Sequence, residues 1–242
     1  MENKPKNYLN DEHLSIGTRE YLRVLNAGGR PVESLPVAEA RKVLADVQAA
    51  VEVDLSGIDE REREIVADGH ALTLHLVRPH GSRGRLPYFV FIHGGGWVLG
   101  DYPTHRRLIR DLVVESEVAA VFVDYTPSPE AKYPQAVDEI YAAVKWVAEN
   151  DAELDLDRRR MALVGNSAGG NMALAAALLA KKRHAPAVRA LVLLWPVTSA
   201  SSDWKSYALY GGERFLTAPL MKWMFDRYTT DARAREEILL SP

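Results

Sequence analysis

The amino-acid sequence predicts an α/β fold built on a mostly parallel, doubly wound sheet. Three observations lead to this class. Short runs that are apolar throughout recur in the middle of the chain, segments with helical periodicity separate them, and turn residues follow the runs. Runs without polar alternation are typical of strands buried on both faces, as in parallel sheets. At 242 residues the chain is long enough for one sizeable domain.

Four apolar runs are expected to form the parallel strands of the sheet. They cover residues 89–92, 119–123, 161–164 and 191–194. Helical segments near 104–117, 135–150 and 168–182 separate them, and this alternation implies right-handed crossovers. In such sheets function gathers at the carboxyl ends of the strands, where this chain has His93, Tyr125, Ser167 and Trp195.

The segments before and after these runs differ in periodicity. Residues 1–55 carry two helical patterns between 10 and 52 and are interpreted as an N-terminal helical cap. Residues 56–202 form the predicted core. Its first part, about 61–79, alternates between apolar and polar residues and is followed by a turn at 81–84, which predicts antiparallel strands. Residues 203–242 have apolar residues at helical spacing and are interpreted as a helical cap insertion that leads back to the core.

Composition narrows the choice of partner. The formal net charge is −3 and both signs are mixed along the chain, so no field favours nucleic acid or anionic lipid. No apolar stretch approaches the roughly 20 residues of a membrane span. The absence of cysteine and the polar start favour a cytoplasmic protein. The scattered histidines show no metal-ligand spacing, so we expect a small-molecule partner and no metal.

The sequence Gly-Asn-Ser-Ala-Gly at 165–169 places a serine between a predicted strand and a predicted helix. Such a serine stands on a strained turn with its hydroxyl exposed, and the flanking glycines leave room for the adjoining strand and helix. Ser167 is therefore the candidate nucleophile, and Gly165 and Gly169 provide the clearance. The N–H of Ala168, at the start of the helix, is a candidate donor to an oxyanion.

A second glycine motif supports the first. His93-Gly94-Gly95-Gly96-Trp97 directly follows a predicted buried strand. Successive glycines let backbone N–H groups point at a reacting carbonyl, and preorganised donors of this kind are worth roughly 3 to 4 kcal/mol each in acyl transfer. The two motifs together therefore favour acyl-transfer chemistry more strongly than either does alone.

The pair HGGGW and GNSAGG resembles the hormone-sensitive-lipase-like family of α/β-hydrolase carboxylesterases, as do Asp124-Tyr125, Pro129-Glu130 and Tyr133-Pro134 between or near them. The resemblance covers most of residues 60–242. It implies an α/β-hydrolase fold with a helical cap that cleaves short-chain acyl esters and needs no cofactor. It also implies these roles: Ser167 as nucleophile, Gly95, Gly96 and Ala168 as oxyanion donors, His93, Gly94, Gly165 and Gly169 as motif support, and Trp97, Asn166 and Tyr125 at the substrate pocket.

The residues needed to activate Ser167 do not follow it in the expected order. A serine nucleophile needs a histidine base oriented by a carboxylate, and in such folds the order is serine, acid, histidine. After Ser167 the one histidine is His184, in a polar stretch where we expect an exposed helix end. The aspartates of this region, Asp203, Asp226 and Asp231, come later. His105 is interpreted as an exposed first-turn histidine rather than a substitute base.

The resemblance implies that the last strands of the fold, with the acid and the histidine, lie beyond Pro242. Three explanations stay open: a cleaved or shortened chain whose remainder is separate, a tail absent from the sequence in hand, or a natural short form. Strand 191–194 would then be an open hydrophobic edge that invites a separate C-terminal fragment or a second copy. We therefore expect this chain alone to be inactive or to need the missing segment.

A second class of function is also open, a non-catalytic small-molecule-binding protein on the same scaffold. The plant gibberellin receptor resembles this family and lacks the histidine. The intact Ser167 and glycine loop favour the esterase, because a receptor has no physical need for either.

Overall fold

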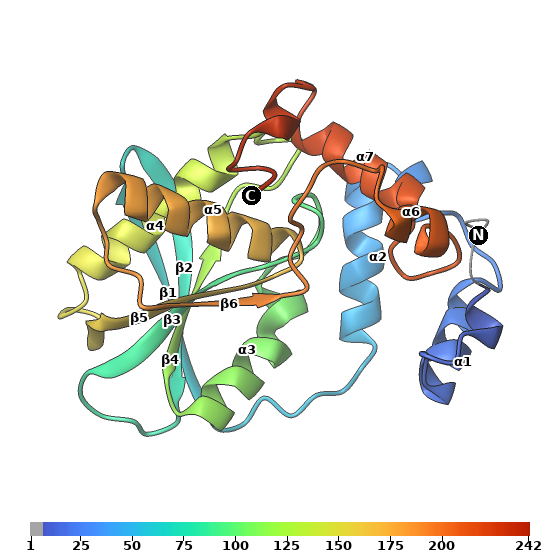
Figure 1. The fold of residues 1–242 in the computed structure, drawn as a ribbon. Helices are drawn as coiled ribbons and strands as arrows, with labels where there is room; N and C mark the ends of the chain where they lie inside the picture. Colours follow the sequence, from blue (N-terminus) through green and yellow to red (C-terminus); the bar gives the residue numbers. More distant parts are fainter. Residues whose placement is uncertain (1–6) are drawn as a thin grey trace.

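The computed structural model describes residues 7–242, so the polar start at residues 1–6 lies outside the described residues. A six-stranded sheet forms the centre of the molecule, in the order β1-β2-β4-β3-β5-β6 (Figure 1). Its strands are β1 Ile58–Ala67, β2 His70–Pro79, β3 Leu86–Ile92, β4 Ala119–Asp124, β5 Leu156–Asn166 and β6 Ala190–Leu194. The four runs expected as strands are all present, within longer strands.

The sheet is antiparallel at one side and parallel at the other. β2 pairs antiparallel with β1 and β4, while β3 pairs parallel with β4 and β5, and β5 with β6. The antiparallel strands expected between 61 and 79 are a hairpin that turns at Asp68 and Gly69, both with left-handed φ of 47° and 89°. The turn at 81–84 instead leads from β2 to β3, which are not neighbours in the sheet. An Asp-Gly pair favours the hairpin because both central residues tolerate a positive φ.

Helices cover the two faces of the sheet unequally. α3 (Tyr102–Ser116) packs on one face, and α4 (Gln135–Glu149) and α5 (Ala168–Arg183) pack together on the other (Figure 1). Strand β3 shows why both faces are filled, since Val90 faces the α4 and α5 side and Phe91 faces α3, each fully buried. A side-chain period of two on an apolar strand places successive residues in separate cores.

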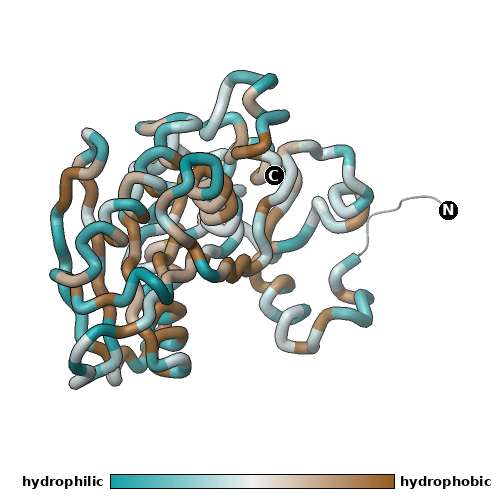
Figure 2. Tube along the Cα trace, turned by 60° about the vertical axis from the view of Figure 1, so that its left-hand side comes forward, coloured by the Kyte–Doolittle hydropathy of each residue, from teal (hydrophilic) through white to brown (hydrophobic). Residues whose placement is uncertain are grey.

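Hydropathy alternates at short range along the chain. Figure 2 shows hydrophobic and hydrophilic stretches alternating through the strands and helices of the body. Within residues 7–242, every helix is too short or too polar to cross a bilayer.

A second group of helices, which we call the cap as predicted, comes from both ends of the chain. It contains α1 Ile16–Leu25, α2 Val37–Ala49, α6 Lys205–Tyr210 and α7 Ala218–Tyr228, with short 3-10 turns at Tyr8–Asn10, Val32–Ser34 and Ala234–Glu236. These helices lie together beside the sheet, at the right of Figure 1. The helical patterns predicted within 10–52 and 203–240 are confirmed as helices, whereas the division at residues 55 and 202 stays a prediction.

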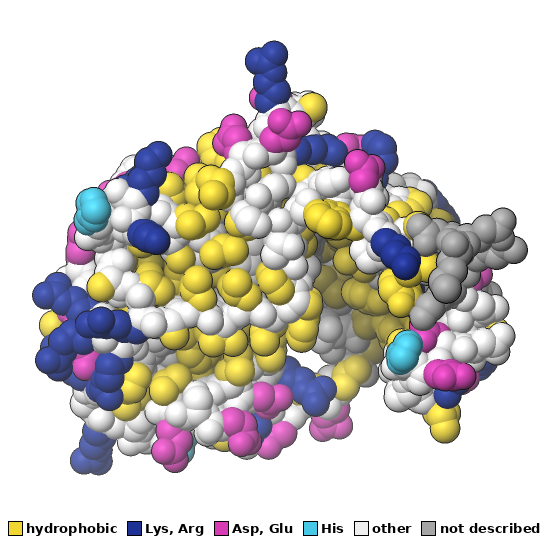
Figure 3. Space-filling view, in the orientation of Figure 1, with side chains coloured by type: hydrophobic (Ala, Val, Ile, Leu, Met, Phe, Trp, Pro, Cys, Tyr) yellow, Lys and Arg dark blue, Asp and Glu magenta, His cyan; other side chains and the backbone are white. Residues whose placement is uncertain are grey.

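Strand β6 is the edge of the sheet on the parallel side. Its side chains Leu191 and Val192 are 38% and 43% exposed, so this run is not buried on both faces as its composition suggests. The reason is that β6 has a neighbour, β5, on one side only within the described residues. The space-filling view shows hydrophobic side chains gathered over this part of the molecule (Figure 3). The expected open hydrophobic edge is therefore present in residues 7–242.

Candidate active site

Ser167 is the single residue between the end of β5 and the start of α5, and its backbone is strained. Its φ is 54° and its ψ is −123°, a conformation that costs a residue with a Cβ of order 1–3 kcal/mol. Hydrogen bonds hold it in place: its N–H donates to Leu194 O at 2.9 Å, and its carbonyl accepts from the N–H groups of Asn171 at 3.1 Å and Val197 at 3.2 Å. The surrounding backbone thus fixes the serine in a conformation it would not adopt alone.

The two glycines that flank the serine are required by close backbone contacts. A Cβ on Gly165 would lie 2.4 Å from Gly169 O, and a Cβ on Gly169 would lie 2.1 Å from Ile92 O. These distances are far below van der Waals contact, and the obstructing atoms are backbone. The turn therefore brings β5, α5 and β3 closer together than any side chain would allow.

The glycine loop that follows β3 lies directly against the serine turn. A Cβ on Gly94 would lie 2.6 Å from Asn166 O and 3.0 Å from Ser167 Cβ. The N–H of Gly94 donates to Asn166 Oδ1 at 2.9 Å. The structure therefore brings the two sequence motifs together, and the side chain of Asn166 joins them rather than simply lining a pocket.

Three backbone donors near Ser167 have no protein partner. Among residues 7–242, no acceptor is found for the N–H groups of Gly95, Gly96 and Ala168. The glycines adopt left-handed φ of 112° and 62°, and Ala168 begins α5, whose first N–H groups have no partner within the helix. Free, preorganised donors beside a serine are what an oxyanion requires.

His93 contacts the glycine loop through a hydrogen bond to the carbonyl of Gly94. Its side chain is 1% exposed, its Nδ1 lies 2.7 Å from Gly94 O, and its ring stacks on Tyr125 at 4.3 Å. Burial, with a smaller effect from neighbouring His105, lowers the pKa of His93 to about 3. The ring is therefore neutral at ordinary pH, and its Nδ1–H donates to the carbonyl of Gly94.

His105 is not the exposed first-turn histidine that the sequence suggested. It is half-buried on α3, with Nδ1 3.2 Å from Asp101 O and Nε2 3.4 Å from Asn166 Nδ2. Burial lowers its pKa. Because Nδ1–H donates to Asp101 O and Nε2 faces an amide N–H, its lone pair is not directed at Ser167. The correction arises because α3 starts directly behind the glycine loop.

Two residues expected at the substrate pocket are buried instead. Trp97 is 1% exposed and stacks on Tyr228 of α7 at 4.6 Å, and Tyr125 is 2% exposed and donates its hydroxyl hydrogen to His93 O. Neither side chain lines an open pocket. The physical reason is that α7 packs onto the glycine loop, where a Cβ on Gly96 would lie only 2.0 Å from Met224 Sδ.

Within residues 7–242, no side chain forms a hydrogen bond with the hydroxyl of Ser167. His184 is exposed and caps the far end of α5, whose 16 residues separate it from Ser167. At 1.5 Å per residue this is about 24 Å. The expectation of an exposed helix end is confirmed, and His184 cannot act as the base in this arrangement.

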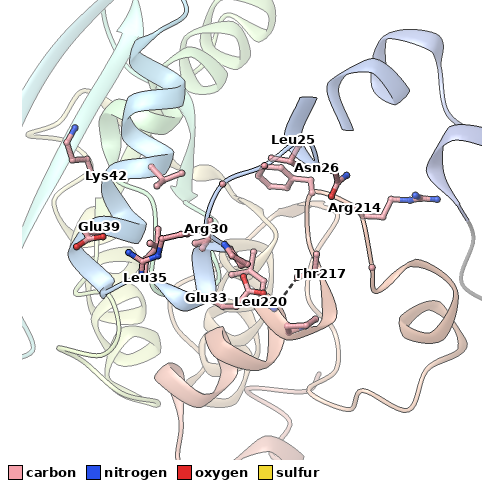
Figure 4. Close-up of a pocket in the computed structure, with 18 of the residues that line it drawn as sticks. Leu25, Asn26, Arg30, Glu33, Leu35, Glu39, Lys42, Arg214, Thr217 and Leu220 are labelled. Carbon is pink, nitrogen blue, oxygen red and sulfur yellow. Dashed lines mark hydrogen bonds between the residues drawn. The ribbon is translucent and has the colours of Figure 1, made fainter. Parts of the chain in front are cut away.

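A large cavity lies in the cap rather than at the serine. It has a volume of about 920 Å³ between the segment after α1, helix α2 and the residues before α7 (Figure 4). Neither Ser167 nor the glycine loop lines it. Leu220, one turn before Met224 on α7, contributes to its wall, so α7 separates this cavity from Gly96.

Comparison with known proteins agrees with this geometry. Residues 89–242 match the model of a family described as alpha/beta hydrolase fold. An ethyl acetate hydrolase of Pseudomonas putida is 31% identical over 92% of the chain, and carboxylesterase NlhH of Mycobacterium tuberculosis is 38% identical over 60%. The crystal structure of a thermostable esterase from Pseudomonas putida ECU1011 superposes with a TM-score of 0.94 and 52% identity over 96% of the chain.

The chain is shorter than these relatives. It spans 73% of the ethyl acetate hydrolase, 46% of NlhH and 73% of the thermostable esterase. It spans 57% of a mimivirus protein, named as an alpha/beta hydrolase, to which it is 32% identical.

We expect Gly169→Ala to lower the free energy of unfolding by about 2–4 kcal/mol, because the added Cβ overlaps backbone atoms of β3 that cannot move aside. Urea unfolding measures the change. Gly212→Ala is the matched control, since a Cβ there meets nothing within 4 Å; its effect should stay below about 1 kcal/mol. Equal effects of the two substitutions would contradict the close packing of the serine turn.

The low pKa of His93 predicts a loss of stability in mild acid. The unfolded chain binds a proton at the ordinary value of 6.5, whereas the folded chain does so only near 3. The stabilisation is therefore present above pH 6.5 and is lost as the pH falls toward 3, at about 1.4 kcal/mol per pH unit. We expect the free energy of unfolding, measured with urea between pH 6.5 and 5, to depend less steeply on pH in His93→Gln than in the unaltered chain. The exposed control His184→Asn should keep the pH dependence of the unaltered chain. An unchanged slope in His93→Gln would show that this histidine is charged in the fold.

Proposed function

Since the chain belongs to the alpha/beta hydrolase fold family, we propose that it carries the nucleophile and oxyanion site of a serine carboxylesterase acting on short-chain acyl esters. The observation that carries the proposal is the strained backbone of Ser167 beside three unpartnered N–H groups. A strained residue persists only where surrounding structure enforces it, and such strain clusters at functional sites. The relatives named as an ethyl acetate hydrolase and a carboxylesterase support the substrate class.

The proposed reaction is acyl transfer. Ser167 Oγ attacks the ester carbonyl, and the carbonyl oxygen acquires negative charge as the tetrahedral intermediate forms. The N–H groups of Gly95, Gly96 and Ala168 donate to that oxygen. A base takes the proton from Ser167 and returns it to the departing alkoxide, so that an alcohol leaves and an acyl-serine remains. Water, deprotonated by the same base, then attacks the acyl-serine and releases the acid while the proton returns to Ser167. His93 takes no proton in this scheme; its Nδ1–H fixes the carbonyl of Gly94 and thereby the loop that carries two of the donors.

The base that takes the proton from Ser167 lies outside the described residues in this proposal. His184 is about 24 Å away along α5. The lone pair of His105 Nε2 faces Asn166. We therefore infer that another segment or chain supplies a histidine and its acid, and that residues 1–242 alone hydrolyse esters poorly.

The second candidate is a non-catalytic small-molecule-binding protein on the same scaffold. The observation that favours it is that Ser167 has no base among residues 7–242. Covalent labelling of the serine separates the two candidates, because a binding protein has no reason to retain a reactive hydroxyl.

The open edge at β6 supports a proposal about assembly. Leu191 and Val192 are exposed on a strand with unpaired backbone groups, a surface that other polypeptides readily extend. We infer that a separate C-terminal fragment, or failing that a second copy of the chain, pairs with this edge. A C-terminal fragment would lie near Ser167, because Leu194 O accepts the N–H of that serine.

We expect a fluorophosphonate probe to label the chain at Ser167 slowly, because the base that would activate the hydroxyl is missing, and Ser167→Ala to abolish labelling. Intact-mass and peptide mass spectrometry locate the adduct. Hydrolysis of p-nitrophenyl acetate should be slower than in a complete serine hydrolase by on the order of 10⁶, the cost of losing the base in a comparable system. Ser201→Ala is the control, as this serine is exposed and outside the motif. Reversible ligand binding without any labelling would instead support the binding protein.

The exposed edge predicts self-association in the absence of a covering fragment. Light scattering after size exclusion should give a mass above the 26.9 kDa of one chain, and Val192→Lys should lower it, because a charged side chain on an edge strand disfavours pairing. Val66→Lys is the matched control, since Val66 is 71% exposed on β1, at the opposite edge. A single-chain mass for all three proteins would argue against a second copy at β6.

A further inference from the structure

Arg41 of α2 is the cap side chain with polar contacts to two loops at the site. Its Nε–H donates to Val98 O at 2.8 Å, and an Nη2 hydrogen donates to Ser128 O at 2.9 Å. Its two Nη groups also pair with the carboxylate of Glu130 at 2.8 and 2.7 Å. One guanidinium thus joins the cap, the end of the glycine loop and the segment after β4.

Val98 belongs to the turn that shapes the glycine loop. The N–H groups of Val98 and Leu99 both donate to Gly95 O, at 3.2 and 2.8 Å, so this turn closes on one of the candidate oxyanion glycines. Ser128 is 1% exposed and its N–H donates to Trp97 O at 2.7 Å. The two carbonyls that accept from Arg41 therefore lie on segments already joined to each other at Trp97.

The ion pair between Arg41 and Glu130 alone would contribute little to stability. The side chain of Glu130 is 53% exposed, and exposed pairs contribute little to stability. The informative feature is that the pair and two backbone carbonyls share one planar group. Glu130 fixes the orientation of the guanidinium, and its pKa is lowered chiefly by the hydrogen bonds from Arg41. A lysine ammonium lacks this planar fork and would not hold all three partners in fixed directions.

Helix α2 has few other attachments. Ala40 is its one buried residue, and Val37 and Leu44 are the partly buried apolar residues packed on the same core. These positions share a helix face with Arg41. The polar connection between this helix and the glycine loop is therefore concentrated in a single side chain.

We infer that Arg41 is a positioning residue, which couples the docking of cap helix α2 to the orientation of the Gly95 and Gly96 N–H groups. The inference rests on the proposed function for its catalytic meaning. When α2 is docked, the guanidinium fixes Val98 O and hence the turn that ends on Gly95. When the helix lifts away, that turn loses its external support and the donors lose their fixed direction.

Hydrogen exchange followed by mass spectrometry tests the coupling without any need for hydrolysis. In the full chain, Arg41→Lys and Glu130→Gln should raise the exchange rate of the peptide covering residues 93–101 by about 10-fold, while the unfolding midpoint changes little. Lys42→Ala is the matched control: Lys42 is the next residue on α2 and pairs only with Asp46 of the same helix. Faster exchange in α2 with an unchanged glycine loop would overturn the inference, because Arg41 would then merely fasten the helix.

Phosphonylation of Ser167 gives the second measurement. Arg41→Lys should lower the maximum rate of labelling by about 10-fold or more, with little change in the probe concentration at half-saturation, since misdirected donors stabilise the charged transition state less well. Loss of probe binding at an unchanged maximum rate would contradict a positioning role. If the unaltered chain is not labelled at all, the proposed function fails, whereas the exchange experiment still decides whether Arg41 couples the cap to the loop.

Discussion

Ser167 keeps its left-handed backbone only because hydrogen bonds from other segments fix the peptide groups on both sides of it. Leu194 at the end of β6 accepts its N–H, and Val197, beyond the strand, donates to its carbonyl. The edge strand is thus part of the site although several of its side chains are exposed. The same constraint explains the glycines, since β3, β5 and α5 must approach to backbone contact for the serine to stand clear of them.

The centre of the site is held by neutral groups. His93 is uncharged, Asn166 contributes an amide and Tyr125 a hydroxyl, and backbone N–H and C=O groups make the hydrogen bonds that fix Ser167. A buried cation or carboxylate here would carry a large desolvation cost. Its charge would also attract or repel the oxyanion, whereas neutral dipoles carry no net charge. Aligned dipoles avoid that cost, and they are in place before charge develops on the substrate. The charged contacts, such as Arg41 with Glu130, lie further out, where solvent reduces the cost of burial.

Much of this arrangement could be predicted from local sequence. The serine turn and the glycine loop were predictable because each motif carries its backbone requirement in consecutive residues. Strand β3 was predictable from its uninterrupted apolar run and α5 from its alanine-rich composition. The hairpin turn at Asp68 and Gly69 could also be predicted, because an Asp-Gly pair between alternating segments is a strong turn signal. The turn expected at 81–84 connects β2 to β3 instead, because its glycines allow a turn of either kind.

Other features depend on contacts between distant segments and leave no local trace. The burial of Trp97 is set by Tyr228 on α7, and nothing near residue 97 indicates that a cap helix covers it. The first turn of a helix suggests an exposed His105, whereas its actual surroundings include His93 and Asn166 of other segments. The contact between Arg41 and Glu130 joins a cap helix to a loop after β4, and periodicity carries no information about such a pair.

The thioether of Met224 against Gly96 has a consequence for how a molecule could reach the loop. Methionine is unbranched and has three rotatable bonds, so its side chain adapts its shape more readily than the rigid rings of Trp97 and Tyr228. Any molecule that approached Gly96 from the side of α7 would therefore meet an adaptable side chain flanked by rigid aromatic rings. Access to the loop from that side would therefore depend on the packing of this one thioether.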